Sequence, residues 1–333
     1  MHPLKFIPIY KPTVWGGQKI KAYKASGSTN PLPAENKLDE MQPIGESWEL
    51  SGVKGNESVV SEGPLAGKTI KELIATYKAE LVGKVNYERY GEEFPLLIKF
   101  IDAQSDLSIQ VHPDDEMAGR RHNGSKGKTE MWYLLDAEED TCLYSGFSQE
   151  ISPEEYEKRV LDGSITEVLA RHQVTPGDVF FLPAGRVHAI CSGCFVAEIQ
   201  QTSDITYRIY DYGRLGLDGK PRQLHIEEAK EAIDYKLDAE YRSAYQPCLN
   251  QEVQLASCPY FTTHLLEIDK PYQKNWSDSD GFLIVICLSG KATLKADGSI
   301  QLSQGETALV PASAEWIEFI PEGPAKFLLS HNL

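Results

Sequence analysis

No run of apolar residues in this 333-residue chain approaches the roughly 20 that a membrane-spanning helix needs. Cysteine is also scarce: six residues are scattered along the chain, which indicates a reduced protein without a disulfide framework. The first ten residues are too short and too polar for a signal peptide. We therefore expect a cytoplasmic protein that neither spans a membrane nor depends on disulfides.

Basic residues are also fewer than acidic ones: the chain has 33 Lys and Arg and 49 Asp and Glu, which gives a formal net charge of −16. This balance argues against nucleic acid and anionic membranes as partners. It leaves room for a small anionic substrate, since a local basic cluster can reverse the global sign. Hydrophobic residues make up 41% of the chain, which is enough for a sizeable core and argues against global disorder.

The most informative stretch is LSIQVHPDD, residues 107–115. As a β-strand it would place Ser108, Gln110 and His112 on one face and apolar residues on the other. Pro113 would end the strand, because proline cannot donate a hydrogen bond to a sheet. A strand with polar groups facing inward is typical of the wall of a small barrel that holds a metal or a ligand.

The remaining pattern predicts β structure with a few added helices. Strands are expected within residues 1–20, 47–52, 95–103, 130–140, 174–190 and 196–214. Helices are expected at about residues 68–85, 152–172 and 225–234. Long loops are expected at residues 26–45 and 117–130, which are rich in glycine and polar residues.

Part of the chain repeats. Residues 177–188 align without gaps on residues 305–316, and the segments before them share a hydrophobic pattern. We therefore predict a catalytic, metal-binding β domain over residues 1–240 and a smaller β domain over residues 241–333. The second copy has Trp316 where the first has His188, so the smaller domain is expected to lack metal ligands.

Four side chains on successive predicted strands could converge on a metal: Gln110, His112, Glu130 and His188. Two imidazole nitrogens, a carboxylate and an amide oxygen suit Zn²⁺, with Fe²⁺, Mn²⁺ or Co²⁺ also possible. A single histidine in a barrel is usually only hydrogen-bonded, but several convergent ligands are much less expected by chance. The weak amide ligand would leave the metal open to water or substrate.

Several lysines and arginines could bind an anion. Lys99 lies inside an apolar strand, where it either snorkels at a sheet edge or points at an anion. The glycine-rich segment over residues 117–130 is either a solvated basic loop or an anion-binding loop; its cations are Arg120, Arg121, Lys126 and Lys128. Lys128 is the best candidate in it, because it shares the strand parity of Glu130.

Four motifs in order carry a specific resemblance: QVHPDD, GKTEMWY, PAGRVHAI and EIQQTSDITYRIYDYGR. Together they resemble type I mannose-6-phosphate isomerase (phosphomannose isomerase) in its short bacterial form. The segments YKPTVWGGQKI and GESWELS fit the same family, so the similarity spans nearly the whole chain. The resemblance implies a mainly β enzyme of two cupin-type (jelly-roll) β-barrels that depends on zinc and interconverts mannose 6-phosphate and fructose 6-phosphate.

The resemblance also implies roles for particular residues. It implies one Zn²⁺ per chain with four ligands: Gln110, His112, Glu130 and His188. Arg208 matches the arginine regarded as catalytic. Glu198 and Arg214 stand where the longer eukaryotic-type enzymes have a glutamate and a lysine, and arginine for lysine keeps the charge but changes the geometry. The chain lacks the large helical insertion of the long-form enzymes.

Aldose–ketose isomerisation moves a proton between C1 and C2 through a cis-enediol, whose developing negative charge a Lewis-acid metal can stabilise. Glu198 and a metal-bound water are both candidates for the base, and Arg208 can stabilise the enediolate. The substrate phosphate needs polar partners away from the metal; the candidates are Lys128, Lys99, Arg214 and Ser108. On a straight strand Arg208 and Arg214 would lie about 20 Å apart, so both reach one sugar only if the chain bends.

Two other functions remain as alternatives. A two-barrel metal dioxygenase would use Fe²⁺, but such sites usually need a three-histidine set. A non-enzymatic sugar-phosphate sensor could lose Arg208 or Glu198 and still bind, yet both residues are present. The isomerase is therefore the favoured hypothesis, while the native metal, the oligomeric state and the pathway served stay open.

Overall fold

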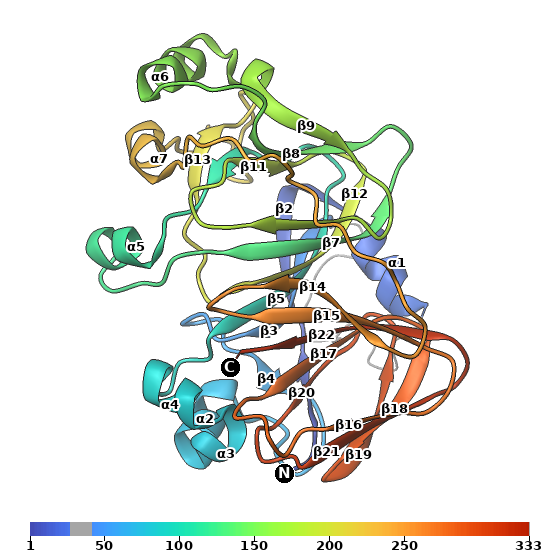
Figure 1. Ribbon diagram of the computed structural model, residues 1–333. Helices are drawn as coiled ribbons and strands as arrows, with labels where there is room; N and C mark the ends of the chain where they lie inside the picture. Colours follow the sequence, from blue (N-terminus) through green and yellow to red (C-terminus); the bar gives the residue numbers. More distant parts are fainter. Residues whose placement is uncertain (27–41, 333) are drawn as a thin grey trace.

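The computed structural model of the protein describes residues 1–26 and 42–332. Its fold is mainly β, as the sequence predicts, with strands in four sheets and short helices around them (Figure 1). Most of the loop expected at residues 26–45 lies outside the described residues. No helix in the described part of the chain is long and apolar enough to cross a membrane.

Two sheets form the half of the molecule that contains the QVHPDD segment. One has six strands in the order β10 (Val179–Leu182), β7 (Glu130–Ala137), β12 (Cys194–Gln201), β5 (Leu96–Asp102), β3 (Ile44–Ser51) and β2 (Ile9–Gly17). The other has five, in the order β13 (Tyr207–Tyr210), β6 (Ile109–Val111), β11 (His188–Ile190), β8 (Cys142–Phe147) and β9 (Leu169–Gln173). The strand expected over the QVHPDD segment is thus only three residues long.

Two further sheets contain the C-terminal strands. The larger runs in the order β14 (Glu252–Ser257), β15 (Thr262–Ile268), β22 (Ala325–His331), β17 (Leu283–Ser289), β20 (Thr307–Val310), β1 (Leu4–Ile7) and β4 (Val59–Val60). The smaller runs β16 (Tyr272–Asn275), β21 (Trp316–Pro321), β18 (Lys291–Ala296) and β19 (Gly298–Ser303). The first strand of the chain therefore pairs with a sheet of the C-terminal half, through β20.

The helices differ in part from those predicted. They are α1 (Lys19–Ala25), α2 (Ile70–Tyr77), α3 (Ala79–Val82), α4 (Lys84–Tyr90), α5 (Asp115–Arg121), α6 (Pro153–Asp162), the 3₁₀ helix η1 (Ile165–Val168) and α7 (Ile226–Ala232). The helix predicted over residues 68–85 is interrupted at Lys78, whose φ of 49° is left-handed, and at Gly83. Apolar spacing alone does not reveal such breaks.

The helix predicted over residues 152–172 is correct only at its start. Ser152 caps α6 by accepting a hydrogen bond from the Glu155 N–H, and Gly163 ends it with a φ of 79°. The last predicted residues form β9 instead, which pairs with β8. The loop expected over residues 117–130 likewise begins with α5, whose N-terminus is capped by Asp114. The glycines there obscured this helix.

The sheets pack as consecutive layers with separate apolar cores. One core joins the six-stranded and seven-stranded sheets across the two halves, and its members include Phe100, Ile199, Ile284 and Leu328. A second core fills the space between the seven-stranded and four-stranded sheets. A third, with Trp132 and Val196, lies between the six-stranded and five-stranded sheets. The candidate site lies between these last two sheets, so both of its walls are supported by packed layers.

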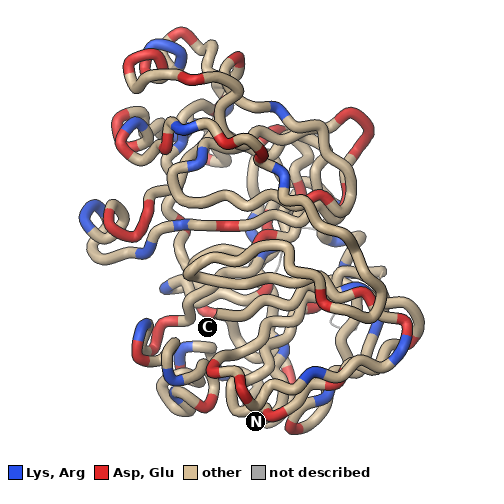
Figure 2. The backbone as a smooth tube through the Cα atoms, in the orientation of Figure 1, with Lys and Arg blue, Asp and Glu red and all other residues tan. Residues whose placement is uncertain are grey.

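Charged residues gather on the helices and on the loops between strands, where water solvates them (Figure 2). A buried ion pair is an exception and joins the two halves. Lys24 Nζ donates to Glu49 Oε2 at 2.8 Å and to the Gly305 carbonyl at 2.7 Å. Burial raises the pKa of Glu49, and the Lys24 charge opposes that rise. A buried charge without its partner is costly.

We expect Lys24→Met to lower the free energy of unfolding by about 3–5 kcal/mol, because it leaves the buried Glu49 carboxylate unpaired. The double variant Lys24→Met/Glu49→Leu should recover most of that loss. Urea denaturation followed by tryptophan fluorescence measures both. A single variant as stable as the parent protein would contradict this view of the pair.

Candidate active site

The inner face of the six-stranded sheet carries a row of side chains at one level. Trp132, Glu198 and Lys99 are neighbours in register across β7, β12 and β5. Trp132 Nε1 donates to Glu198 Oε2 at 2.8 Å, and Lys99 Nζ lies 3.3 Å from Glu198 Oε1. Trp48 continues the row on β3, with Lys99 Nζ 5.2 Å from its ring centroid. Strand alternation alone puts these residues on the face that turns away from the shared core.

A second row stands on the five-stranded sheet. Arg208 on β13 is paired in register with Gln110 on β6, and Gln110 with His188 on β11. Adjacent strands are about 4.8 Å apart, so Arg208 lies one strand from Gln110 and two strands from His188. The row therefore places an arginine beside two of the expected metal ligands.

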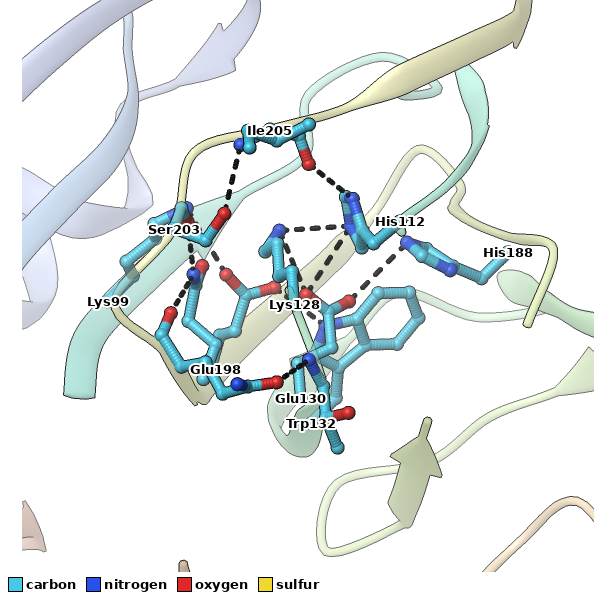
Figure 3. A network of polar contacts seen from close by, with 12 residues as sticks. Lys99, His112, Lys128, Glu130, Trp132, His188, Glu198, Ser203 and Ile205 are labelled. Carbon is cyan, nitrogen blue, oxygen red and sulfur yellow. Dashed lines mark hydrogen bonds and ion pairs between the residues drawn. The ribbon is translucent and has the colours of Figure 1, made fainter. Parts of the chain in front are cut away.

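Three buried side chains converge at one end of these rows (Figure 3). Donor atoms of His112, Glu130 and His188 all lie within 4.8 Å of one another. His112 Nε2 is 3.6 Å from Glu130 Oε2, and His188 Nε2 is 3.4 Å from Glu130 Oε1. The three residues come from β7, the start of β11 and the position after β6, so the fold brings together segments 76 residues apart, from position 112 to 188.

Backbone carbonyls orient both imidazoles. His112 Nδ1 is 2.9 Å from the Ile205 carbonyl, and His188 Nδ1 is 2.8 Å from the Arg186 carbonyl. A carbonyl can only accept, so each Nδ1 carries the proton and each Nε2 directs a lone pair into the cluster. This is the arrangement in which metal-binding histidines are usually held.

The residues present fit a divalent transition metal. Glu130 Oε1 and His188 Nε2 are buried without a hydrogen-bond partner in the described structure, an expensive arrangement unless something binds there, while Glu130 Oε2 is paired with Lys128. Two ligands about 2.1 Å from a tetrahedral ion lie about 3.4 Å apart, close to the measured separations. Two imidazoles and a carboxylate suit zinc, and Gln110 stands next to His188 as a possible fourth ligand.

Lys128 lies at the cluster. Its Nζ is 2.9 Å from Glu130 Oε2 and donates to His112 Nε2 at 3.0 Å. The lone pairs that would bind a metal thus already face a cation. The position favours a role beside the metal ligands over the phosphate-binding role expected from the sequence.

Burial shifts the protonation of the cluster. It lowers the pKa of His188 to about 3 and, with the nearby Lys128 charge, holds the pKa of His112 well below its usual value. Both imidazoles are therefore neutral near pH 7, the form that binds metals. Burial and the Glu198 charge raise the pKa of Glu130 to about 7, against the effect of Lys128.

Glu198 is held in its charged form. Burial by itself would raise its pKa, but Lys128, Lys99 and the Trp132 N–H together lower it to about 2. Lys99 is enclosed by two carboxylates, with Glu46 Oε2 3.6 Å and Glu198 Oε1 3.3 Å from its Nζ. Lys99 is thus aimed inward rather than snorkelling, and its charge is compensated.

A cavity of about 160 Å³ lies between the two rows. It is lined by residues of both sheets and of the segment after β12: Trp15, Glu46, Trp48, Lys99, Ile101, Leu107, Ser108, Gln110, Lys128, Trp132, Ile190, Glu198, Asp204, Thr206, Arg208 and Arg222. Arg214 is not among them: it donates to the Asp106 carbonyl and to Asp211. The chain does bend after Arg208, but Arg214 stays outside the cavity.

Sequence reasoning missed two groups that line this cavity. Glu46 and Trp48 share the parity of their strand, a signal that is visible but not specific. Arg222 carries no local signal, because it lies in an irregular segment after β13. An Asp218-Gly219 pair between two short segments is typical of a chain reversal, which would have indicated that Arg222 returns toward Arg208.

The chain matches known families at both ends. Residues 4–140 match the family described as phosphomannose isomerase type I, catalytic domain. Residues 251–332 match mannose-6-phosphate isomerase, cupin domain.

Curated and solved proteins resemble the whole chain. The probable mannose-6-phosphate isomerase GmuF of Bacillus subtilis is 35% identical over 99% of each chain. Mannose-6-phosphate isomerase ManA of the same species is 33% identical over 99% of this chain and 98% of that one. The crystal structure of the mannose 6-phosphate isomerase from Bacillus subtilis superimposes with a TM-score of 0.86 and 30% identity, over 99% of this chain and 100% of that one.

We expect His112→Ala and His188→Ala each to weaken the binding of a divalent metal by more than about 100-fold. Loss of a residue that only orients a metal ligand typically costs about 10–100-fold, and these variants would remove a ligand itself. Elemental analysis after dialysis measures the bound metal, and circular dichroism should show a retained β fold. His264→Ala, in the C-terminal half, is the matched control and should keep its metal. Full metal content in both cluster variants would refute the ligand assignment.

Proposed function

The chain belongs to the type I phosphomannose isomerase family, and on that premise we propose that it interconverts mannose 6-phosphate and fructose 6-phosphate with the help of a bound metal. The observation that carries this proposal is the cluster of His112, Glu130 and His188 behind a cavity, in a chain 35% identical along its length to such an isomerase. Family membership already makes the protein an aldose–ketose isomerase.

We propose zinc as the metal, held by four ligands: Gln110, His112, Glu130 and His188. The donor set and the buried, unpartnered Glu130 Oε1 and His188 Nε2 support this assignment. When bound, the metal would act as a Lewis acid toward the negative charge that develops as the proton moves between C1 and C2 through a cis-enediol.

Two cations stand where they can stabilise that same charge. Lys128 Nζ contacts two of the metal-ligand candidates. Arg208 lines the cavity beside Gln110, and its Nε is a buried donor without a partner in the described structure. A donor that is held in place before the reaction needs little reorganisation when the charge develops. We propose that both act on the enediolate.

Glu198 has a different task. A carboxylate with a pKa of about 2 is a weak base, so its charge is better suited to accept a hydrogen bond from a sugar hydroxyl. Its Oε1 has no hydrogen bond within the described structure, although Lys99 lies 3.3 Å away. We propose that Glu198 and Lys99 orient the sugar, and that Ser108, a buried hydroxyl in the cavity wall, assists them.

We also propose the finer architecture implied by the resemblance: each pair of facing sheets is a cupin-type barrel, with the catalytic domain ending near residue 240. The separate cores between the paired sheets support this division. Six free cysteines support a reducing, cytoplasmic location. Neither a sensor nor a dioxygenase finds comparable support, because the curated relatives that cover the whole chain are isomerases.

The purified protein should convert mannose 6-phosphate to fructose 6-phosphate in a coupled assay. Treatment with a chelator, followed by its removal, should abolish turnover, and added Zn²⁺ should restore it, because the ligand cluster has no other cation of comparable charge. An unchanged circular dichroism spectrum of the metal-free protein is the control for unfolding. Full activity in metal-free protein would contradict metal dependence.

Alanine at Lys128 or Arg208 should lower kcat by about 10²–10³-fold while KM changes by less than about threefold, because the charge that each residue stabilises exists only near the transition state. Steady-state kinetics of the metal-loaded variants measure both constants. Lys126→Ala, in the same segment as Lys128 but not in the cavity wall, is the matched control. If Lys128→Ala raises KM without lowering kcat, Lys128 binds the substrate phosphate instead of stabilising the enediolate.

A further inference from the structure

Positive charge is unevenly compensated along the cavity. At the end near the metal-ligand cluster, two lysines face three carboxylates: Lys99 and Lys128 face Glu46, Glu130 and Glu198. Beside the other end, three arginines surround one carboxylate, Asp211: Arg208 and Arg222 line the cavity, while Arg214 and Asp211 do not. These four side chains together have a net charge of +2, in a chain whose net charge is −16; Asp204 is a further carboxylate in the cavity wall.

The backbone after β13 turns back on itself and brings Arg222 to this end. Tyr212 and Gly213 have φ values of 56° and 70°, so the backbone leaves the extended conformation of the strand and turns there. Leu215 then forms an antiparallel bridge with Pro221, so the chain returns across a short turn. Arg208 Nη1 donates to the Gln223 carbonyl at 2.9 Å, which fastens the returning segment to β13.

Asp211 holds the Arg222 guanidinium in a fixed orientation. Arg222 Nε lies 2.7 Å from Asp211 Oδ2, and Arg222 Nη2 lies 2.5 Å from Asp211 Oδ1. The carboxylate is buried, and Arg222 and Arg214 lower its pKa against the opposing effect of burial. This fork leaves Nη1 without a hydrogen bond in the described structure, on a side chain that is 22% exposed and lines the cavity.

Distance along the sheet separates Arg222 from the reacting carbons. The row of His188, Gln110 and Arg208 crosses three strands, or about 10 Å at the usual strand spacing. Arg222 lines the same cavity as Arg208 and lies close enough to it for their charges to interact. A six-carbon sugar that presents C1 and C2 to the metal ligands carries its phosphate at the opposite end of its chain.

We propose that Arg222 is the residue that binds the substrate phosphate and selects for it, and that Asp211 is the positioning residue that presents it. This inference rests on the proposed function of the same cavity. A planar guanidinium fixed on one edge offers its other N–H groups to a phosphate oxygen, the geometry in which arginine is a better ligand than lysine. The net positive charge of the group formed by Arg208, Arg214, Arg222 and Asp211 suits an anionic phosphate.

The test is the kinetics of the metal-loaded Arg222→Met and Arg222→Lys variants. Phosphate carries its charge throughout the reaction, so Arg222→Met should raise KM for mannose 6-phosphate by about 10–100-fold and leave kcat within about threefold. The inhibition constant of inorganic phosphate should rise by a similar factor. Arg222→Lys should fall between the methionine variant and the parent, because it keeps the charge and loses the fork.

Lys220→Met is the matched control, because it removes an exposed cation from the same turn without touching the cavity wall. It should leave KM and the inhibition constant unchanged. Denaturation midpoints of all variants show whether each one is folded. If Arg222→Met does not fold, the KM and the inhibition constant of Arg222→Lys provide the test instead. An unchanged KM in the folded Arg222 variants, or a loss confined to kcat, overturns the proposal.

Calorimetric binding of inorganic phosphate separates this inference from the proposed function, since it needs no turnover. If the parent protein fails to isomerise mannose 6-phosphate, the proposed function fails. The assignment of Arg222 then still stands if phosphate binds the parent protein and binds Arg222→Met at least about tenfold more weakly. If the parent protein and Arg222→Met bind phosphate equally, or if the parent protein binds none, the assignment of Arg222 as the phosphate-binding residue is wrong.

Discussion

A carboxylate without water must be compensated, and Glu130 is completely enclosed between two sheets. Its oxygens face two imidazole nitrogens and one ammonium group, from His112, His188 and Lys128. Each of these partners is itself buried, so none can move into solvent to relieve an imbalance. Lys128 already compensates part of the Glu130 charge, and the metal proposed for this site would bind to the donor atoms that Lys128 leaves free.

The two facing rows follow from strand geometry. Alternation turns every second residue of β7, β12 and β5 toward the cavity and gives the others to the core shared by both halves. The apolar residues that stabilise the fold therefore fix the level at which Glu198 and Trp132 meet. A slip of one residue in β12 would exchange Glu198 with Ala197 and remove the row, which makes register a condition for the chemistry.

The cavity is divided by charge. Lysines paired with carboxylates occupy one end, beside the proposed metal ligands. Arg208 and Arg222 line the other end, and both lie near the carboxylate of Asp211. In the proposed function, this local surplus of positive charge would favour one orientation of the substrate, since the reverse orientation would place the phosphate against Glu46, Glu130 and Glu198. The compensated and uncompensated ends thus provide direction as well as affinity.

The sequence by itself determined what depends on local pattern. Local patterns act within a few residues: examples are strand alternation around Gln110 and His112, the shared parity of Glu130 and Trp132, and the helix cap at Ser152. Four motifs in order were enough to indicate the family. Tertiary structure decided what depends on distant contacts. Lys128 meets His112 because its backbone N–H donates to the Pro113 carbonyl, Arg214 donates to the Asp106 carbonyl, and Arg222 reaches the cavity because a turn reverses the chain. Such pairings join residues far apart in sequence, and no local propensity encodes them.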